Sequence, residues 1–147
     1  GISMNKNYPP EMHTAEHILN GTMVKMFGKG RSFSAHIEKK KSKCDYRFDR
    51  DLTEEELRQI ENNVNEVIAG NHLITEEYIP KAEGERLYNL ERLPEGTGET
   101  IRIIKVGDYD ACPCIGQHVT NTSEIGKFRI ISSSYENGVM RLRFKLE

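Results

Sequence analysis

The chain has 147 residues, of which 30% are charged, and its formal net charge is −2. A chain of this length fits one compact domain, which on folding buries roughly 70% of the surface that the unfolded chain exposes. The near-neutral charge excludes a strongly basic nucleic-acid coat protein, although it leaves room for a local basic patch that contacts one nucleic-acid end.

The sequence favours a chain that stays in the cytoplasm. No apolar run approaches the roughly 20 residues of a membrane span, and the start does not resemble a signal peptide. We interpret Gly1 as a tag remnant and expect residues 1–8 to be a tail and residues 9–147 to be the domain. Cys112 and Cys114 flank a single proline, so a disulfide between them would be strained, and a Cys/His pair at short spacing in a reducing compartment is more often a metal ligand set.

The first predicted element is a helix of about 17 residues after Pro9-Pro10, which ends at Gly28 and Gly30. Its apolar residues recur at helical spacing: Met12, Ala15, Leu19, Met23 and Met26. His13 and His17 are four residues apart and therefore share a second face of this helix. Two extended segments follow, residues 33–37 and 44–48, which fit a hairpin.

The second helix is marked at both ends. Thr53 is its predicted N-cap, Glu56 completes a capping box, and Gly70 ends it. Its apolar residues again recur at helical spacing: Leu57, Ile60, Val64, Val67 and Ile68. A strand over residues 72–79 and a short helix over residues 83–90 follow.

The remaining elements are extended. A loop marked by Pro94, Gly96 and Gly98 precedes a buried strand over residues 100–106. Residues 110–118 contain Pro113 and Gly116 and are expected to be loop.

The end of the chain gives the clearest strand signal. Residues 125–134 form a predicted strand that runs into Asn137-Gly138, a type I′ hairpin turn. The last strand alternates apolar and basic residues: Met140, Leu142, Phe144 and Leu146 against Arg141, Arg143 and Lys145. We therefore predict an α+β fold, a single domain in which an antiparallel sheet packs with two main helices.

Two pairs of metal-binding residue types recur at the same spacing. The histidines at 13 and 17 alone fit a metal site or ordinary surface histidines equally well. Cys114 and His118 are also four residues apart, on the glycine-bearing loop. Neutral imidazole and thiolate are the ligands that zinc prefers, so together the pairs predict a Zn²⁺ site built from His13, His17, Cys114 and His118. Closed four-ligand sites are usually structural and catalytic ones leave a position for water, so we take His118 as the candidate for the loosest ligand.

The helix motif alone also fits other zinc enzymes. Residues 13–17 read HTAEH and match the H-x-x-E-H pattern of inverted zinc proteases, for which this chain is short. The S-ribosylhomocysteine lyases are similar in size, in this motif and in using one distant cysteine. That family offers no counterpart to His118.

A third resemblance covers most of residues 12–131, in order. Residues 13–19 read HTAEHIL and resemble the H-T-A-x-H-[IL]-L opening of the alanyl-tRNA synthetase editing domain. Residues 114–126 resemble its C-x-G-x-H-V…T-x-E-I-G segment, and residues 46–57 resemble its R-F-D…L-T-x-E-E-L middle. The loop departs from the family pattern, because Gln117 stands directly before His118 and Gly116 is its only glycine.

The resemblance implies a stand-alone, zinc-dependent protein with the fold of the threonyl- and alanyl-tRNA synthetase editing domains. Its implied activity is hydrolysis of a wrong aminoacyl ester at the acceptor end of tRNA, most commonly serine or glycine attached to alanine tRNA. Thr14 and Thr22 are candidates to hydrogen-bond a serine hydroxyl, a contact that lets a pocket reject alanine. A helical threonine equally bonds its own backbone.

Three further predictions concern side chains outside the ligand set. Glu16 is a candidate to orient a water, or else a solvated helix residue. His36 lies where the family places polar residues that face the adenosine or water, or else it is a half-buried strand histidine. A run of lysines is either a solvated loop or a contact to tRNA phosphates: Lys39, Lys40, Lys41 and Lys43. A different small zinc enzyme of the lyase type and a non-catalytic, zinc-stabilised tRNA-binding domain remain the alternative functions.

Overall fold

A computed structural model describes residues 8–90, 93 and 98–147. Its elements follow in the order α1 (Pro10–Phe27), β1 (Ser34–His36), β2 (Ser42–Arg47), α2 (Glu54–Ala69), β3 (Ile74–Pro80), α3 (Lys81–Leu87), β4 (Thr100–Val106), β5 (Asp110–Pro113), a 3-10 turn η1 (Thr122–Glu124), β6 (Phe128–Glu136) and β7 (Val139–Leu146). The strands form two antiparallel sheets, of order β1-β2-β7-β6 and β3-β4-β5. The predicted α+β class is confirmed.

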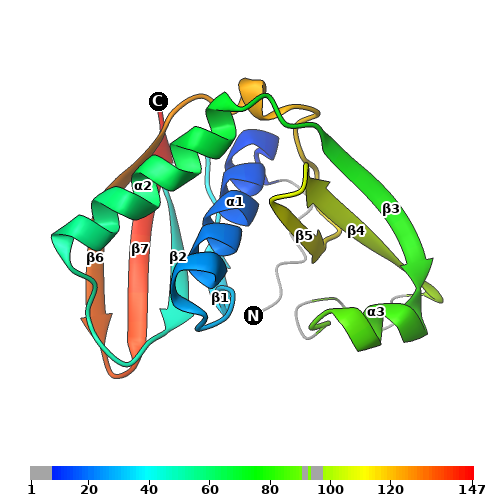
Figure 1. The fold of residues 1–147 in the computed structure, drawn as a ribbon, viewed down its shortest axis with the longest axis horizontal. Helices are drawn as coiled ribbons and strands as arrows, with labels where there is room; N and C mark the ends of the chain where they lie inside the picture. Colours follow the sequence, from blue (N-terminus) through cyan, green and yellow to red (C-terminus); the bar gives the residue numbers. More distant parts are fainter. Residues whose placement is uncertain (1–7, 91–92, 94–97) are drawn as a thin grey trace.

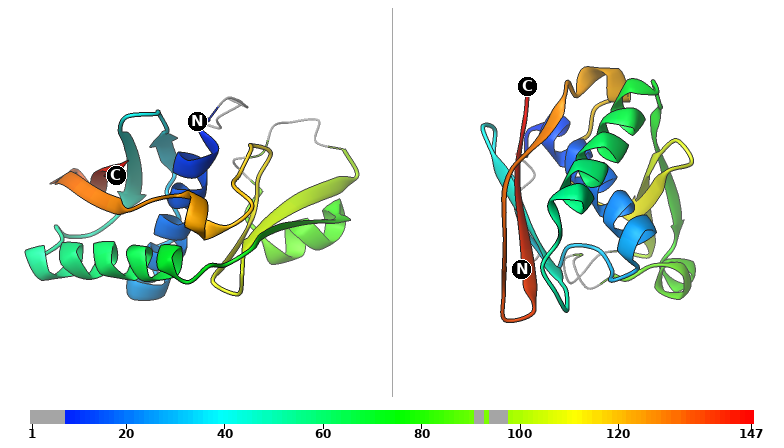
Figure 2. Two further views of the ribbon diagram at one scale, coloured as in Figure 1. Left: turned by 90° about the horizontal axis from the view of Figure 1, so that it is seen from above. Right: turned by 60° about the vertical axis from the view of Figure 1, so that its left-hand side comes forward.

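Helix α1 lies between the two sheets, and α2 lies beside it across the four-stranded sheet (Figures 1 and 2). Side-chain bonds fix α2 to the edge strand β6. The Asn65 amide bonds both the N–H and the C=O of Phe128 at 2.8 Å, and the Glu61 carboxylate accepts from the Ile130 N–H at 2.7 Å. Helix α1 is therefore covered by the four-stranded sheet, the three-stranded sheet and α2.

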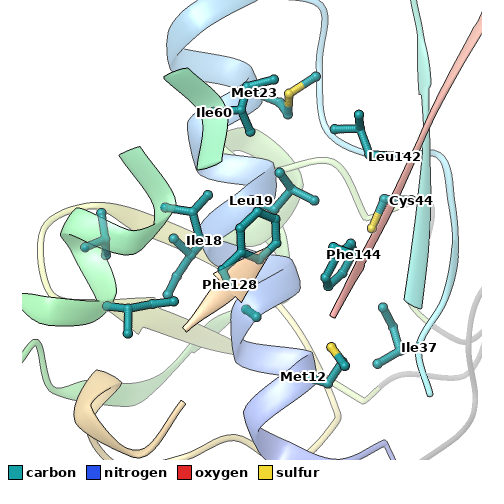
Figure 3. Packing of buried hydrophobic residues seen from close by; sticks show 14 of the residues in the cluster. Met12, Ile18, Leu19, Met23, Ile37, Cys44, Ile60, Phe128, Leu142 and Phe144 are labelled. Carbon is teal, nitrogen blue, oxygen red and sulfur yellow. The ribbon is translucent and has the colours of Figure 1, made fainter. Parts of the chain in front are cut away.

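Residues 12–23 of α1 are all buried, the polar ones included. Pro10 at the first turn needs no hydrogen-bond donor, and Gly28 ends the helix in the left-handed region with φ 66°. The apolar side of the helix faces the four-stranded sheet, where Met12 and Leu19 belong to the same core cluster as Phe144 from β7 (Figure 3). Its other side carries polar residues toward the three-stranded sheet.

Local signals were reliable for the second helix and the last hairpin. Thr53 caps α2, and both hydrogen bonds of the predicted capping box with Glu56 are present. Asn137 and Gly138 have φ values of 51° and 80°, as a type I′ turn requires. The inward residues of β7 are fully buried: Met140, Leu142 and Phe144.

The prediction that residues 110–118 are all loop was wrong. Asp110–Pro113 form β5, which pairs antiparallel with β4 and is the edge strand of its sheet. Pro113 is the last residue of that strand, where a missing backbone donor costs no ladder bond. The expected single sheet is thus two sheets, and Pro94 and Gly96 of the predicted loop lie outside the described residues.

None of the helices that the structure describes combines the length and the apolar character needed to cross a membrane.

The core predicts a clear contrast between two leucines. Leu19 is fully buried and Leu73 is 63% exposed. Leu19→Ala should lower the free energy of unfolding by about 2–5 kcal/mol, because it removes apolar contacts and leaves a cavity. Leu73→Ala should change it by less than about 0.5 kcal/mol. Urea unfolding of both variants checks this, and equal losses would contradict the described packing.

Candidate metal centre

Four side chains converge between α1 and the segment after β5. They are the predicted ligand set, His13 and His17 on one face of α1 and Cys114 and His118 on the loop. One donor atom from each lies within 4.8 Å of the others, and His13, His17 and Cys114 are buried. The structure therefore brings the four residues together into a group that could hold a metal ion.

The spacing of these donors fits a tetrahedral ion. The Cys114 Sγ lies 3.4 Å from Nε2 of His13 and 3.4 Å from Nε2 of His118. Bonds of about 2.0–2.1 Å to nitrogen and 2.3 Å to sulfur place tetrahedral ligands about 3.5 Å apart. His118 is as close to the thiol as His13 is, so the geometry does not set it apart from the other ligands.

Hydrogen bonds fix which nitrogen of two of the rings faces the centre. The Nδ1 of His13 donates to the Gln117 carbonyl at 3.2 Å, since a carbonyl only accepts. The Thr14 hydroxyl donates its one hydrogen to the Pro10 carbonyl at 2.8 Å. The hydroxyl oxygen therefore accepts from the Nδ1–H of His118, at 2.9 Å. Both rings therefore present the Nε2 lone pair toward Cys114, as outer-shell bonds do in metal sites.

The third ring is backed by a carboxylate. Asp110 Oδ2 lies 3.8 Å from the Nδ1 of His17, and the Asp110 side chain is only 5% exposed. Arg31 holds this carboxylate with two hydrogen bonds, at 2.6 and 3.1 Å. This separation is longer than a hydrogen bond, so Asp110 acts on the His17 ring through its charge.

Without an ion the cluster is uncharged at its thiol and at His118. Burial raises the pKa of the Cys114 thiol to about 12. Burial, with the nearby His13 and Arg102, lowers the pKa of His118 to about 2. A cation at the centre would reverse the first effect, because a coordinating thiol is deprotonated.

The loop that carries Cys114 is held by its backbone. Arg102 of β4 donates to the carbonyls of Cys114 and Gly116, at 3.1 and 2.7 Å. The Gly116 N–H points at the Cys114 Sγ at 3.4 Å. The Gln117 side chain is exposed and only its carbonyl bonds His13, which explains how the loop accommodates this departure from the family pattern.

Sequence reasoning missed Arg102 and Asp110. The first had a signal, since an arginine inside the buried strand of residues 100–106 needs acceptors. Asp110 had none, because its partners Arg31 and His17 lie far from it in sequence.

A cavity of about 510 Å³ opens beside the cluster. His13, His17 and Cys114 line it, and basic and aromatic side chains form other parts of its wall: Lys29, Arg31, Phe33 and Arg47. Glu16 also lines it, is buried, and places its Oε1 3.7 Å from the His13 Nε2.

The other predicted site residues lie apart from the cavity wall. Thr14 is fully buried and its hydroxyl bonds Pro10, Val119 and His118, whereas the hydroxyl of Thr22 bonds Ile18 and Tyr109. His36 on β1 is exposed, and its Nε2 lies 3.0 Å from Glu38 Oε1. The lysines at 39, 40 and 41 are exposed between β1 and β2, and Lys43 lies on β2.

Gly116 should be essential for space at the cluster. A Cβ built there would lie 2.3 Å from Cε1 of His13, although its φ is not in the left-handed region. Gly116→Ala should therefore displace the His13 ring and weaken Zn²⁺ binding by about 10–100-fold. Gly98→Ala, where a Cβ meets nothing within 4 Å, is the matched control. Zinc titration against a chromophoric chelator measures both, and equal affinities would contradict the close approach of Gly116 to His13.

Comparison with known proteins relates part of this chain to a known family. Residues 101–143 match the family described as the threonyl and alanyl tRNA synthetase second additional domain. This stretch contains Cys114 and His118.

Longer similarity is found to archaeal proteins named alanine–tRNA ligase. The chain is 33% identical over 136 residues to that of Thermococcus kodakarensis, 34% over 137 residues to that of Aeropyrum pernix, and 35% over 141 residues to that of Methanosarcina mazei. Each alignment covers 90% of this chain and 15% of the relative, so the chain spans about 15% of the length of the curated relatives it matches. The chain is thus similar to the second additional domain of threonyl and alanyl tRNA synthetases.

Proposed function

We propose that this protein is a zinc-dependent trans-editing hydrolase, which removes a wrong amino acid, serine or glycine, from alanine tRNA in the cytoplasm. The observation that carries the proposal is the buried cluster of three imidazoles and one thiol beside the 510 Å³ cavity. The similarity to this family supports a tRNA-related role for that cavity.

The donor set fits zinc better than harder ions. Three histidines and one cysteine offer nitrogen and sulfur, whereas Mg²⁺ and Ca²⁺ prefer oxygen ligands. When bound, zinc supplies a Lewis acid that polarises a carbonyl and acidifies water. We propose His13, His17, Cys114 and His118 as the residues that hold it.

Side chains around the proposed metal have the other roles in the reaction. Glu16 lines the cavity next to His13, where its carboxylate can orient a water and accept its proton. Thr14 is a positioning residue, since its hydroxyl holds the Nδ1–H of His118. The prediction that His36 faces the adenosine stays a prediction.

Cationic groups at the cavity suit a nucleotide end. Lys29, Arg31 and Arg47 line it. Lys29 and Arg31 are paired with Asp49 and Asp110, so Arg47 is the cation best placed to contact a phosphate of an acceptor strand. The lysines at 39, 40, 41 and 43 extend this charge along β2 and the turn before it. We propose that they contact tRNA.

One observation favours the non-catalytic alternative. Four donor atoms that all lie within 4.8 Å of one another resemble a closed structural zinc site. A zinc-stabilised domain that binds tRNA and does no chemistry is therefore the second candidate function.

Zinc binding should release about one proton near neutral pH. The Cys114 thiol, whose pKa burial raises to about 12, is protonated there and must lose its proton, whereas His118, with its pKa near 2, is already neutral. The apparent Kd for Zn²⁺ should therefore fall about tenfold for each unit that the pH rises between 6 and 8. Calorimetry in two buffers of different ionisation enthalpy counts the protons, and a count of zero or two would contradict this assignment.

A deacylation assay tests the proposed function. The protein should hydrolyse Ser-tRNA and Gly-tRNA for alanine and spare Ala-tRNA. His13→Ala, Cys114→Ala and removal of the metal by a chelator should each reduce hydrolysis to the uncatalysed rate, because each disrupts the centre.

His72→Ala is the control, since His72 lies outside the cluster. Lack of hydrolysis of any ester by the zinc-loaded protein would overturn the catalytic proposal. Retained tRNA binding in that case would favour the non-catalytic alternative.

A further inference from the structure

The outward side of the four-stranded sheet carries basic residues from three strands. We call Lys43 of β2, Arg143 and Lys145 of β7 and Arg129 of β6 the cationic face. Strand alternation directs them away from the core, since their neighbours Cys44, Leu142 and Phe144 are fully buried. No proposed ligand of the metal centre is among them.

The register sets like charges directly opposite each other. Lys43 pairs with Arg143 across β2 and β7, and Lys145 pairs with Arg129 across β7 and β6. Neighbouring strands are about 4.8 Å apart, and like charges in direct opposition destabilise a sheet. The fold therefore holds two unfavourable pairs side by side on one surface.

Carboxylates relieve only part of this repulsion. Asp45 binds Arg141 with two hydrogen bonds, at 2.7 and 2.9 Å, and Glu147 binds Arg129. Within the described ranges, no carboxylate forms an ion pair with Lys43, Arg143 or Lys145. Arg143 bonds only the Ser132 hydroxyl, at 3.3 Å.

This charge is not a property of the whole chain, whose formal net charge is −2. Helix α2, which is bonded to β6 through Asn65 and Glu61, covers the inner side of the same sheet. That helix is acidic: Glu54, Glu55, Glu56, Glu61 and Glu66. The molecule is thus polarised across the sheet, and such a field orients an approaching polyanion.

The cationic face is continuous with the cavity through β2. Arg47, on the same strand as Lys43, lies 4.2 Å over the Phe33 ring, and both line the cavity. Four strand residues span about 13 Å, so one helical polyanion can cover the face while its end enters the cavity.

We propose that the cationic face docks the phosphate backbone of an RNA duplex, namely the helical stem of a tRNA whose end lies in the cavity. The inference rests on the proposed function and adds where the stem lies. An anionic membrane fits the surface less well, because membrane-bound surfaces insert apolar side chains. Ile131 is the large exposed apolar residue of β6 here, and no other is exposed on the described parts of β2 or β7.

Charge reversal on the cationic face separates docking from folding. Lys43→Glu and Lys145→Glu each convert a like-charge pair into an opposite-charge pair, so Tm should not fall. The double variant should nevertheless bind tRNA about tenfold more weakly at 50 mM KCl, with a salt slope smaller by about 2. Arg58→Glu on exposed α2 changes the charge by −2, as each single variant does and half as much as the double variant. It is the control for each substitution and should bind within about twofold of the original protein.

Fluorescence anisotropy with labelled, deacylated alanine tRNA at 50 to 200 mM KCl measures these affinities. Equal binding by the double variant and Arg58→Glu would overturn the proposal, as would failure of the original protein to bind tRNA at 50 mM KCl. Binding to anionic lipid vesicles that the double variant loses, while its tRNA binding is intact, would also overturn it. Hydrolysis of Ser-tRNA by the original protein is measured in parallel, and its absence would overturn the proposed function without affecting the binding comparison.

Discussion

Helix α1 is enclosed by a sheet on either side, so the polar side chains along its middle are buried and need hydrogen-bond partners within the protein. Burial of an unpaired polar group costs several kcal/mol at most sites, which makes these partners a condition of the fold. The loop after β5 supplies the partners of two of these side chains, because Gln117 bonds His13 and Val119 bonds Thr14. The three-stranded sheet is therefore needed both to cover the helix and to place its bonding partners.

This constraint also shapes the site. His13 and Thr14 are held by the same loop that carries Cys114 and His118, so packing of the helix and convergence of the donors are one event. Arg102 fixes the loop from β4, and Arg31 fixes Asp110 behind His17. Three of the four donors, His13, His17 and Cys114, are buried. Donors that packing holds in place are what a site of fixed coordination geometry requires.

Local patterns were enough to predict most elements. Thr53 and Glu56 cap their own helix, and Asn137-Gly138 form their own turn, so neighbouring residues contain the information. β5 was missed because its strand character comes from pairing with β4, while Pro113 within it reads as a loop signal. The division of strands into two sheets likewise depends on long-range pairing that no local pattern encodes.

The candidate site also divides into features visible in the local sequence and features that depend on long-range contacts. The residue types and spacing of the four donors were visible in the chain, and the structure brings them together. The roles of their neighbours were not visible, because helical spacing places Thr14 near His13 without revealing that its hydroxyl supports His118. The exposure of His36 beside Glu38 was not visible either, because it depends on the position of β1 at the edge of its sheet.

Thr14 and His118 are 104 residues apart in sequence, and the ligands His13 and Cys114 are 101 apart. During synthesis, His13 and His17 emerge long before the chain has reached Cys114. A nascent or truncated chain therefore presents only half of the donor set, which binds an ion far more weakly than the complete one. The complete donor set therefore forms only once the loop after β5 has been made and has folded onto α1.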